Sequence, residues 1–432
     1  MKPVVCAIFL LVMPAAARTA AAQVARLEEL PAPQRATAPD SDDDEKRFRF
    51  RNRPSLRFGS LLRIDFRLKL QGDFRSFEEG VDEEEGFEMN RRRVGIQGTF
   101  LKAFEYEVER ELREENVWRD VFVNFRHFDD FQVRAGKFKV PFSLEQLTGP
   151  TDLDFIYRTN LVENLSPGRE VGVALHGQFN RRAVGYEVGM FDGDGEDENA
   201  RGDRNPGAER TIAARVTGRP LRRAKLPANA SELTLGFAIT SGNVPEGLNS
   251  LRGRTAFSEA FIDPVYVQGR RLRLGVEADW QPGPFSAKAE FIRVSDERNN
   301  QGVLQEDLPA IVAHGWYVSG TWTVTGESKS GGIEPRRPLL RGGLGALELA
   351  TRYERFGFGT SFAGEAETTS PRGANLLETS DSAWTGGVNW YINRWTKVQL
   401  NVIREWLEDV NRSPVPDRQL FWTRVVRLQF VL

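Results

Sequence analysis

The chain has 432 residues, and its 59 Lys and Arg against 61 Asp and Glu give a formal net charge of −2. A mean hydropathy of −0.45 excludes a helical membrane protein, which needs several apolar runs of about 20 residues. The 29 Phe and 9 Trp exclude a wholly disordered chain, and the balanced charge gives no reason to expect a nucleic-acid partner. One Cys and three His offer little material for a metal site, so we expect neither a metal nor a cofactor.

Residues 1–22 have the features of a secretory signal peptide. Lys2 provides a positive start, residues 4–13 form an apolar run, and an alanine-rich stretch ending at Ala22 offers a cleavage site. Ten apolar residues are too few to span a bilayer. We therefore expect cleavage after Ala22, which also removes Cys6.

Residues 23–55 are predicted to form a flexible N-terminal tether. Residues 23–44 are rich in Ala, Pro and acidic residues and lack a usable apolar face. A basic run from Lys46 to Arg57 follows, and its part 46–53 is typical of a solvated charged segment. The folded domain is expected to span residues 56–432.

From residue 62 to the C-terminus, apolar and polar residues alternate. In the segment 62–70 every second residue is apolar, and Arg63, Asp65, Arg67 and Lys69 lie between them. Only a strand separates alternate residues in this way. The pattern predicts sixteen strands that start near residues 61, 90, 104, 117, 130, 170, 182, 210, 232, 270, 284, 312, 344, 382, 395 and 420.

These segments predict an all-β fold, a 16-stranded antiparallel transmembrane β-barrel. Most have about nine to twelve residues, the length with which a tilted strand crosses a bilayer, and an even strand number is the rule for outer-membrane barrels. Short connections such as 101–103 alternate with long ones such as 138–169 and 357–381. The turns 218–231 and 326–343 are longer than this rule predicts. We expect the protein to lie in the lipid of a Gram-negative outer membrane.

Five segments resemble the phosphate-selective porin O and P family. They are Arg134–Leu147, Pro167–Gly177, Arg91–Gly95, Gly189–Gly195 and Ala383–Tyr391, in the order in which that family carries similar motifs. The resemblance implies a homotrimer and a long third loop folded into the pore. It also implies passive diffusion of small anions, phosphate or polyphosphate, through a basic constriction.

The basic residues of the lumen are the candidate anion-binding residues. Alternation alone places on the inner face Arg63, Arg67, Lys69, Arg93, Arg134, Arg215, Arg273, Arg352 and Arg427. The resemblance brings the loop 138–169 into the pore, so that Lys137, Lys139, Arg158 and Arg169 lie at or beside the constriction. Acidic residues alternate inward as well, so each of these cations could instead be paired with a carboxylate in the wall.

Other functions stay open at this point. A general or sugar diffusion porin without phosphate selectivity is the main alternative within the same fold. An outer-membrane hydrolase would need a nucleophile held by a His, and no Gly-x-Ser-x-Gly motif is present. A non-conducting adhesin barrel is the third alternative. We expect a channel and not an enzyme.

Overall fold

The computed structural model describes residues 48–50, 53–78, 85–112, 117–193, 209–223, 232–256, 259–360, 378–415 and 417–432. All of them belong to one compact unit, Thr37–Leu432. The predicted signal peptide, 1–22, and most of the predicted tether, 23–55, lie outside the described residues. No helix in this part of the chain is long and apolar enough to cross a membrane.

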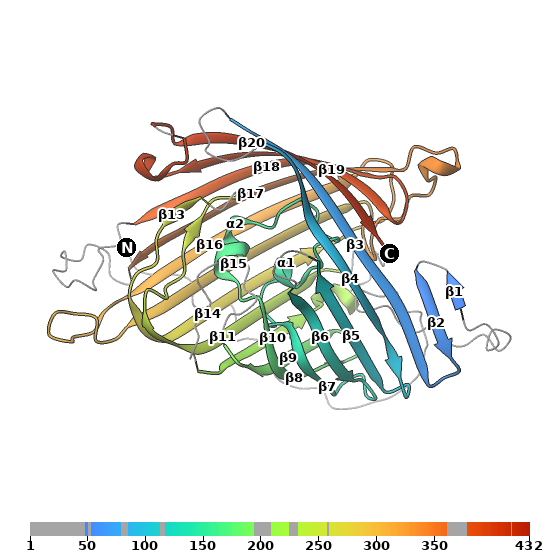
Figure 1. The fold of residues 1–432 in the computed structure, drawn as a ribbon, viewed down its shortest axis with the longest axis horizontal. Coiled ribbons are helices and arrows are strands. Elements are labelled where there is room, and N and C mark those ends of the chain that lie inside the picture. The colour runs from blue at the N-terminus through green and yellow to red at the C-terminus, as the bar shows by residue number, and fades with distance from the viewer. Residues whose placement is uncertain are drawn as a thin grey trace. The chain divides into compact units, whose positions relative to one another are not determined.

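Sixteen antiparallel strands form a closed ring, in which β20 returns to pair with β3 (Figure 1). The strands are β3 (Leu62–Phe77), β4 (Gly86–Phe100), β5 (Phe104–Glu111), β6 (Trp118–Phe125), β7 (Gln132–Lys139), β8 (Arg169–Phe179), β9 (Val184–Phe191), β10 (Thr211–Gly218), β11 (Thr234–Gly247), β14 (Val267–Trp280), β15 (Phe285–Arg298), β16 (Leu308–Thr323), β17 (Ala346–Thr360), β18 (Thr379–Tyr391), β19 (Thr396–Leu407) and β20 (Leu420–Val431). The predicted fold class is confirmed, and every predicted strand start lies within four residues of the observed one.

A short N-terminal hairpin extends this ring. Strands β1 (Phe48–Phe50) and β2 (Pro54–Phe58) pair with each other, and β2 pairs with the first residues of β3, from Ser55 opposite Asp65 to Phe58 opposite Leu62. Strand β20 pairs with the rest of β3 on the same side. The C-terminal residues of the predicted tether are therefore strand and not flexible chain.

The barrel wall has an apolar outer face and a polar inner face. Val276 is 49% exposed, and its cross-strand neighbours Phe237 and Phe291 are 46% and 42% exposed. On the other face of the same strand, Arg273 and Glu277 are buried. In a soluble protein, apolar residues are mostly buried and charged residues are exposed. Here the distribution is reversed, as expected for a barrel wall that is surrounded by lipid.

Connections differ in length at the two ends of the barrel. One end has short turns such as 101–103 and 281–284, together with the long turns 219–233 and 324–345, which the sequence had marked as exceptions. The other end has long loops, among them 140–168 with helices α1 (Leu144–Leu147) and α2 (Asn160–Leu165). The remaining short elements are β12 (Gly253–Arg254), β13 (Ala260–Ile262) and the 3₁₀ turns η1 (Pro220–Arg223), η2 (Leu339–Arg341) and η3 (Val410–Arg412).

Substitution Val276→Arg tests the outward face. It places a charge in the apolar band, so the free energy of unfolding should fall by about 2–4 kcal/mol, measured by urea titration of folding into lipid vesicles. Val276→Ala is the control, because it shortens the same side chain without adding charge. A loss below about 1 kcal/mol would contradict a position within the band, since charges near the interface cost about that much or less.

Candidate functional site

The long connection 140–168 lies inside the barrel. Its backbone bonds to inward side chains from separate strands: the Ile156 carbonyl accepts from Arg427 Nη1 of β20 at 2.6 Å, and the Ile156 amide donates to Asn401 Oδ1 of β19 at 2.7 Å. On β3, Gln71 Nε2 donates to the Pro150 carbonyl at 3.2 Å. In Figure 1 both of its helices lie within the ring of strands.

Carboxylates of the wall accept hydrogen bonds from the first turns of both helices. Glu290 of β15 accepts from the amides of Leu144 and Glu145 at 2.9 and 2.7 Å, at the start of α1. Glu354 of β17 accepts from the amide of Leu161 at 3.2 Å, at the start of α2. Helix N-termini expose unpaired amides and partial positive charge, so an acceptor there stabilises each helix.

Two further wall carboxylates hold the start of α2. Asn160 Nδ2 donates to Asp381 Oδ2 of β18 at 2.8 Å and to Glu405 Oε1 of β19 at 2.7 Å. The amide of Ala256, in the neighbouring loop, also donates to Glu405 at 3.1 Å. Four wall carboxylates, Glu290, Glu354, Asp381 and Glu405, are thus engaged by the inserted loops.

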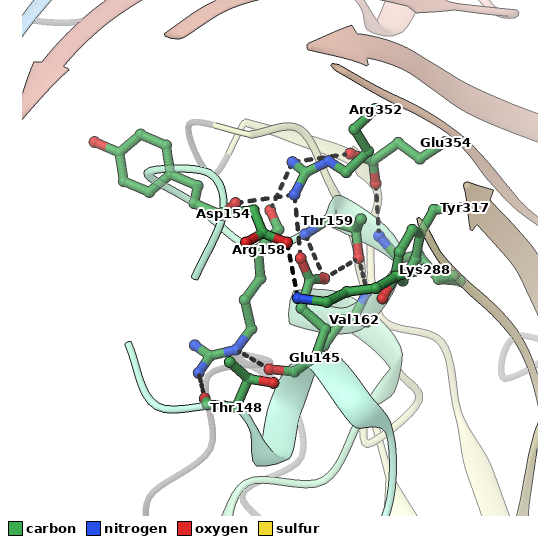
Figure 2. Close-up of polar contacts among 12 residues, drawn as sticks. Glu145, Thr148, Asp154, Arg158, Thr159, Val162, Lys288, Tyr317, Arg352 and Glu354 are labelled. Atoms are coloured by element: carbon green, nitrogen blue, oxygen red, sulfur yellow. Dashed lines mark hydrogen bonds and ion pairs between the residues drawn. The ribbon is translucent and has the colours of Figure 1, made fainter. Parts of the chain in front are cut away.

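Arg352 of β17 lies at the centre of the contacts in Figure 2. Its Nη1 donates to Glu145 Oε1 at 3.2 Å and to the Tyr157 carbonyl at 3.0 Å, and its Nη2 donates to the Arg158 carbonyl at 3.3 Å. The guanidinium lies over the Phe155 ring at 4.6 Å. One buried arginine therefore joins the two helical parts of the loop to the wall.

Two of the predicted constriction residues hold the C-terminal end of α1. Lys139 Nζ donates to the carbonyls of Gln146, Leu147 and Thr148 at 2.6, 3.1 and 3.0 Å. Arg158 Nη2 donates to the same Thr148 carbonyl at 2.9 Å. A cation at a helix C-terminus satisfies carbonyls that lack partners within the helix.

Asp154 links the loop to two lysines from other parts of the chain. Its Oδ2 lies 2.7 Å from Lys288 Nζ of β15, and its Oδ1 lies 2.6 Å from Lys329 Nζ in the turn 324–345. Burial alone would raise the pKa of Asp154, but the two ammonium groups outweigh burial and hold this pKa below its usual range. A turn from one end of the barrel thus meets a loop from the other.

Apolar side chains fill the interior beside α2. Leu161 and Leu165 are fully buried in one cluster with Phe261 of β13 and with Phe356 and Phe358 of β17. The three phenylalanine rings meet edge to face, with centroids 5.5, 6.2 and 6.0 Å apart. The described interior beside α2 is therefore a packed apolar cluster.

The wall β3–β8 carries basic and acidic side chains instead. Lys69 Nζ lies 2.5 Å from Glu109 Oε2. Arg93 Nε donates to Glu111 Oε2 at 2.5 Å, and its Nη1 lies 3.3 Å from Glu109 Oε1. These predicted inward residues do face the interior, and each has a carboxylate partner.

Other predicted cations are paired in the same way. Arg169 Nη2 donates to Asp120 Oδ2 at 2.8 Å, and Arg67 pairs with Glu107. Arg63 lies 2.9 Å from Asp65 and Arg134 lies 3.4 Å from Glu187. Arg215 pairs with Glu277, Arg427 with Asp73 at 2.6 Å, and Arg273 donates to the Leu165 carbonyl at 3.0 Å.

Lys137 is not placed with the other predicted constriction residues. It is paired across the sheet with Val121 and Val171, and Val171 is 48% exposed on the outer face. Residues directly opposite each other on neighbouring strands share a face. The register therefore puts Lys137 on the outer face, because the expected inward turn of the chain begins only at Lys139.

Sequence reasoning missed several polar residues of the interior. Arg91, whose Nη1 donates to Gln71 Oε1 at 2.6 Å, interacts electrostatically with Arg93 and Arg158. Its position two residues before Arg93 is the signal that could have identified it. Lys397 donates to the carbonyls of Thr151 and Leu153 at 3.3 and 3.2 Å, and it also alternates inward. Nothing in the sequence pattern indicates that Lys329, in a turn, reaches the interior.

Comparisons with known proteins agree with this architecture. The model of the family described as phosphate-selective porin O and P matches residues 63–432. An uncharacterized protein of Caulobacter vibrioides is 25% identical over 277 residues, which are 62% of this chain and 55% of that protein. Porin O of Pseudomonas aeruginosa is 27% identical over 202 residues, 45% of this chain and 42% of that one. The chain thus spans about half the length of the curated relatives it matches.

Among solved structures, an anion-selective porin from Comamonas acidovorans has the same fold. It superposes with a TM-score of 0.54 at 11% sequence identity, over 85% of this chain and 99% of that one. At this identity the likeness concerns the fold alone.

Substitution Arg352→Gln tests the attachment of the loop. It leaves Glu145 buried without its cation, so the free energy of unfolding should fall by about 3–5 kcal/mol in urea titrations. Arg355→Gln, three residues further along the same strand on the exposed outer face, is the control and should change stability far less. Equal losses for both variants would contradict the role of Arg352.

The pH dependence of stability tests the contacts of Asp154. Because its folded pKa is lowered, its ion pairs stabilise the fold above the ordinary aspartate pKa of about 4, and this stabilisation is lost as the pH falls through the folded pKa. The difference in unfolding free energy between wild type and Asp154→Asn should be constant above about pH 5 and shrink below about pH 4.

Proposed function

Since the chain belongs to the phosphate-selective porin O and P family and is a porin of the Gram-negative outer membrane, we propose that it conducts small anions by passive diffusion. The proposed path runs between the inserted loop 140–168 and the wall β3–β8. Lys69, Arg93, Lys139, Arg158 and Arg169 are the proposed anion-contacting residues on this path. Arg63, Arg67 and Arg134 extend the basic surface along the same wall.

The observation that supports this proposal is that the inserted loop covers charged side chains on one side of the described interior and not on the other. Carboxylates on β15–β19, such as Glu290, Glu354 and Asp381, accept hydrogen bonds from the loop and are covered by it. The basic residues of β3–β8 lie across the interior from that apolar and acidic filling. The proposed solute path therefore runs along β3–β8, where the cations Lys69, Arg93 and Arg169 lie beside their partner carboxylates.

The proposed path carries an excess of positive charge. Six cations, Lys69, Arg91, Arg93, Lys139, Arg158 and Arg169, meet four carboxylates, Glu109, Glu111, Asp120 and Glu163, an excess of two. Field lines focus in a narrow cleft with low-dielectric walls, so a small excess raises the local anion concentration. Guanidinium and ammonium donors also replace part of an anion's hydration shell.

We propose phosphate or polyphosphate as the preferred solute. The family description and the relative named Porin O support this choice. Arginine and lysine donors at several heights along the wall suit an anion with several oxygens. A general diffusion porin would share the fold and the passage but would not be blocked by phosphate.

We also propose a homotrimer, as the family resemblance implies. Strands β5, β6, β7, β9 and β10 have 8 residues each, whereas β14–β17 have 14 to 16. At the usual rise and tilt, 8 residues span about 20 Å, less than the apolar band of about 25 Å. In a trimer, the short strands of each copy would pack against those of the other copies. They would then no longer face lipid that is thicker than they are tall. Native mass spectrometry of the detergent-extracted protein should show three chains.

Ion selectivity in a planar bilayer tests the proposed path. The reversal potential in a salt gradient should have the sign of an anion-selective channel, and added phosphate should reduce the chloride current. Lys69→Gln with Arg91→Gln and Arg93→Gln should lower the anion-to-cation permeability ratio by about tenfold, the lower end of the enrichment that a charged cleft provides. Glu109→Gln with Glu111→Gln should move the ratio the opposite way.

A matched control removes three cations from turns at the short-turn end. Lys102→Gln with Arg337→Gln and Arg341→Gln changes exposed residues outside the proposed path and should leave the ratio unchanged. We call it the turn variant. Cation selectivity of the wild type would refute the basic path. So would equal changes of the permeability ratio in the turn variant and in the variant that lacks Lys69, Arg91 and Arg93. Anion selectivity without block by phosphate would contradict the phosphate preference and would indicate a general anion porin.

A further inference from the structure

Five basic side chains form a row on the outer face of β15–β20. They are Arg293, His314, Arg355, Arg404 and Arg424, and all five are exposed. Their register partners are outward residues: Arg293 lies opposite His314, Arg355 opposite Trp316, and Arg404 opposite Trp384 and Trp422. We call this set the outer basic row.

The row keeps one level on the barrel although the strands are staggered. Counted from the short-turn end of its own strand, Arg293 lies eight residues above Phe285, His314 nine above Thr323, Arg355 nine above Ala346, Arg404 eight above Thr396 and Arg424 seven above Val431. Eight residues of a tilted strand rise about 20 Å. Because short turns face the periplasm in this class of barrel, the row lies at the outer edge of the apolar band.

The outer basic row differs from the lumen in its partners. Arg404 stacks on Trp422 at 5.2 Å, and Arg355 donates to Ser380 Oγ at 3.1 Å and lies 3.7 Å from Glu408. Within the described ranges, no carboxylate forms an ion pair with Arg293, Arg404 or Arg424. In the lumen, by contrast, nearly every predicted cation has an acid beside it. Three arginines of the row, Arg293, Arg404 and Arg424, therefore face the surroundings of the barrel without an ion-pair partner among the described residues.

We propose that the outer basic row binds the phosphate groups of an outer-leaflet lipid. Arginine forks match phosphate oxygens in pairs, and charge complementarity selects an anionic headgroup. Below the row, Trp316 and Trp384 are 42% and 40% exposed, which suits the boundary between headgroups and acyl chains. The inference rests on the membrane location of the barrel and not on which ions it conducts.

Lipid binding to the full chain in detergent tests the proposal. The probes are lipid A with two phosphates, the same lipid with its phosphates removed, and inorganic phosphate alone, each followed by native mass spectrometry. We expect the phosphorylated lipid to remain bound, and Arg293→Gln with Arg404→Gln and Arg424→Gln to weaken this binding about 100-fold. Each basic side chain near an anionic lipid contributes about a factor of five.

The turn variant removes the same number of charges and should bind the phosphorylated lipid like wild type. Replacing the three arginines of the row by lysine should retain most of the binding, because the charge is kept. If the triple Gln variant does not fold, as judged by its migration in unheated gels, Arg424→Gln alone should still weaken binding about fivefold. Equal binding of the dephosphorylated lipid, displacement of the lipid by an equal concentration of inorganic phosphate, or unchanged binding by the row variants would overturn the proposal.

Discussion

The pairing of β20 with β3 is the constraint on which the rest of this molecule depends. A sheet in hydrocarbon cannot leave its edge amides and carbonyls unpaired, so the first and last strands must meet. Once the ring is closed, each strand has one face in lipid and one face toward an enclosed space. The alternation of apolar and charged residues follows from that division, and so does the need to satisfy many buried charges inside.

The inserted loop solves much of that second problem. It brings backbone amides to the carboxylates of β15–β19 and carbonyls to Lys139, Lys397 and Arg427. Short helices serve this purpose because their ends expose amides and carbonyls that the helix itself cannot satisfy. The loop therefore provides hydrogen-bond partners for charged side chains of the wall, and it also narrows the interior. One side contains an apolar core, and the other carries paired charges such as Lys69 with Glu109 and Arg93 with Glu111.

The strands could be predicted because their signal is local, a period of two that each segment carries by itself. The positions of Arg67, Lys69 and Arg93 followed from that period, whereas Lys137 was misplaced, because the point where a strand turns inward has no periodic mark. The partners of the loop were beyond prediction: Arg427 and Ile156 are 271 residues apart in sequence. Which acid neutralises which base depends on the register and on the path of the loop, and neither is visible in composition or spacing.

The shared edge of β3 has a consequence for assembly. Strand β20 ends opposite Lys69, and β2 begins its pairing opposite Asp65, so only Phe66, Arg67 and Leu68 separate the last paired position of β20 from the first of β2. A slide of β20 toward the periplasm by four residues, which is two side-chain repeats, would bring Val431 opposite Asp65 and therefore against the hairpin. The N-terminal hairpin thus acts as a physical stop, which limits how far the register of the final seam can shift in that direction.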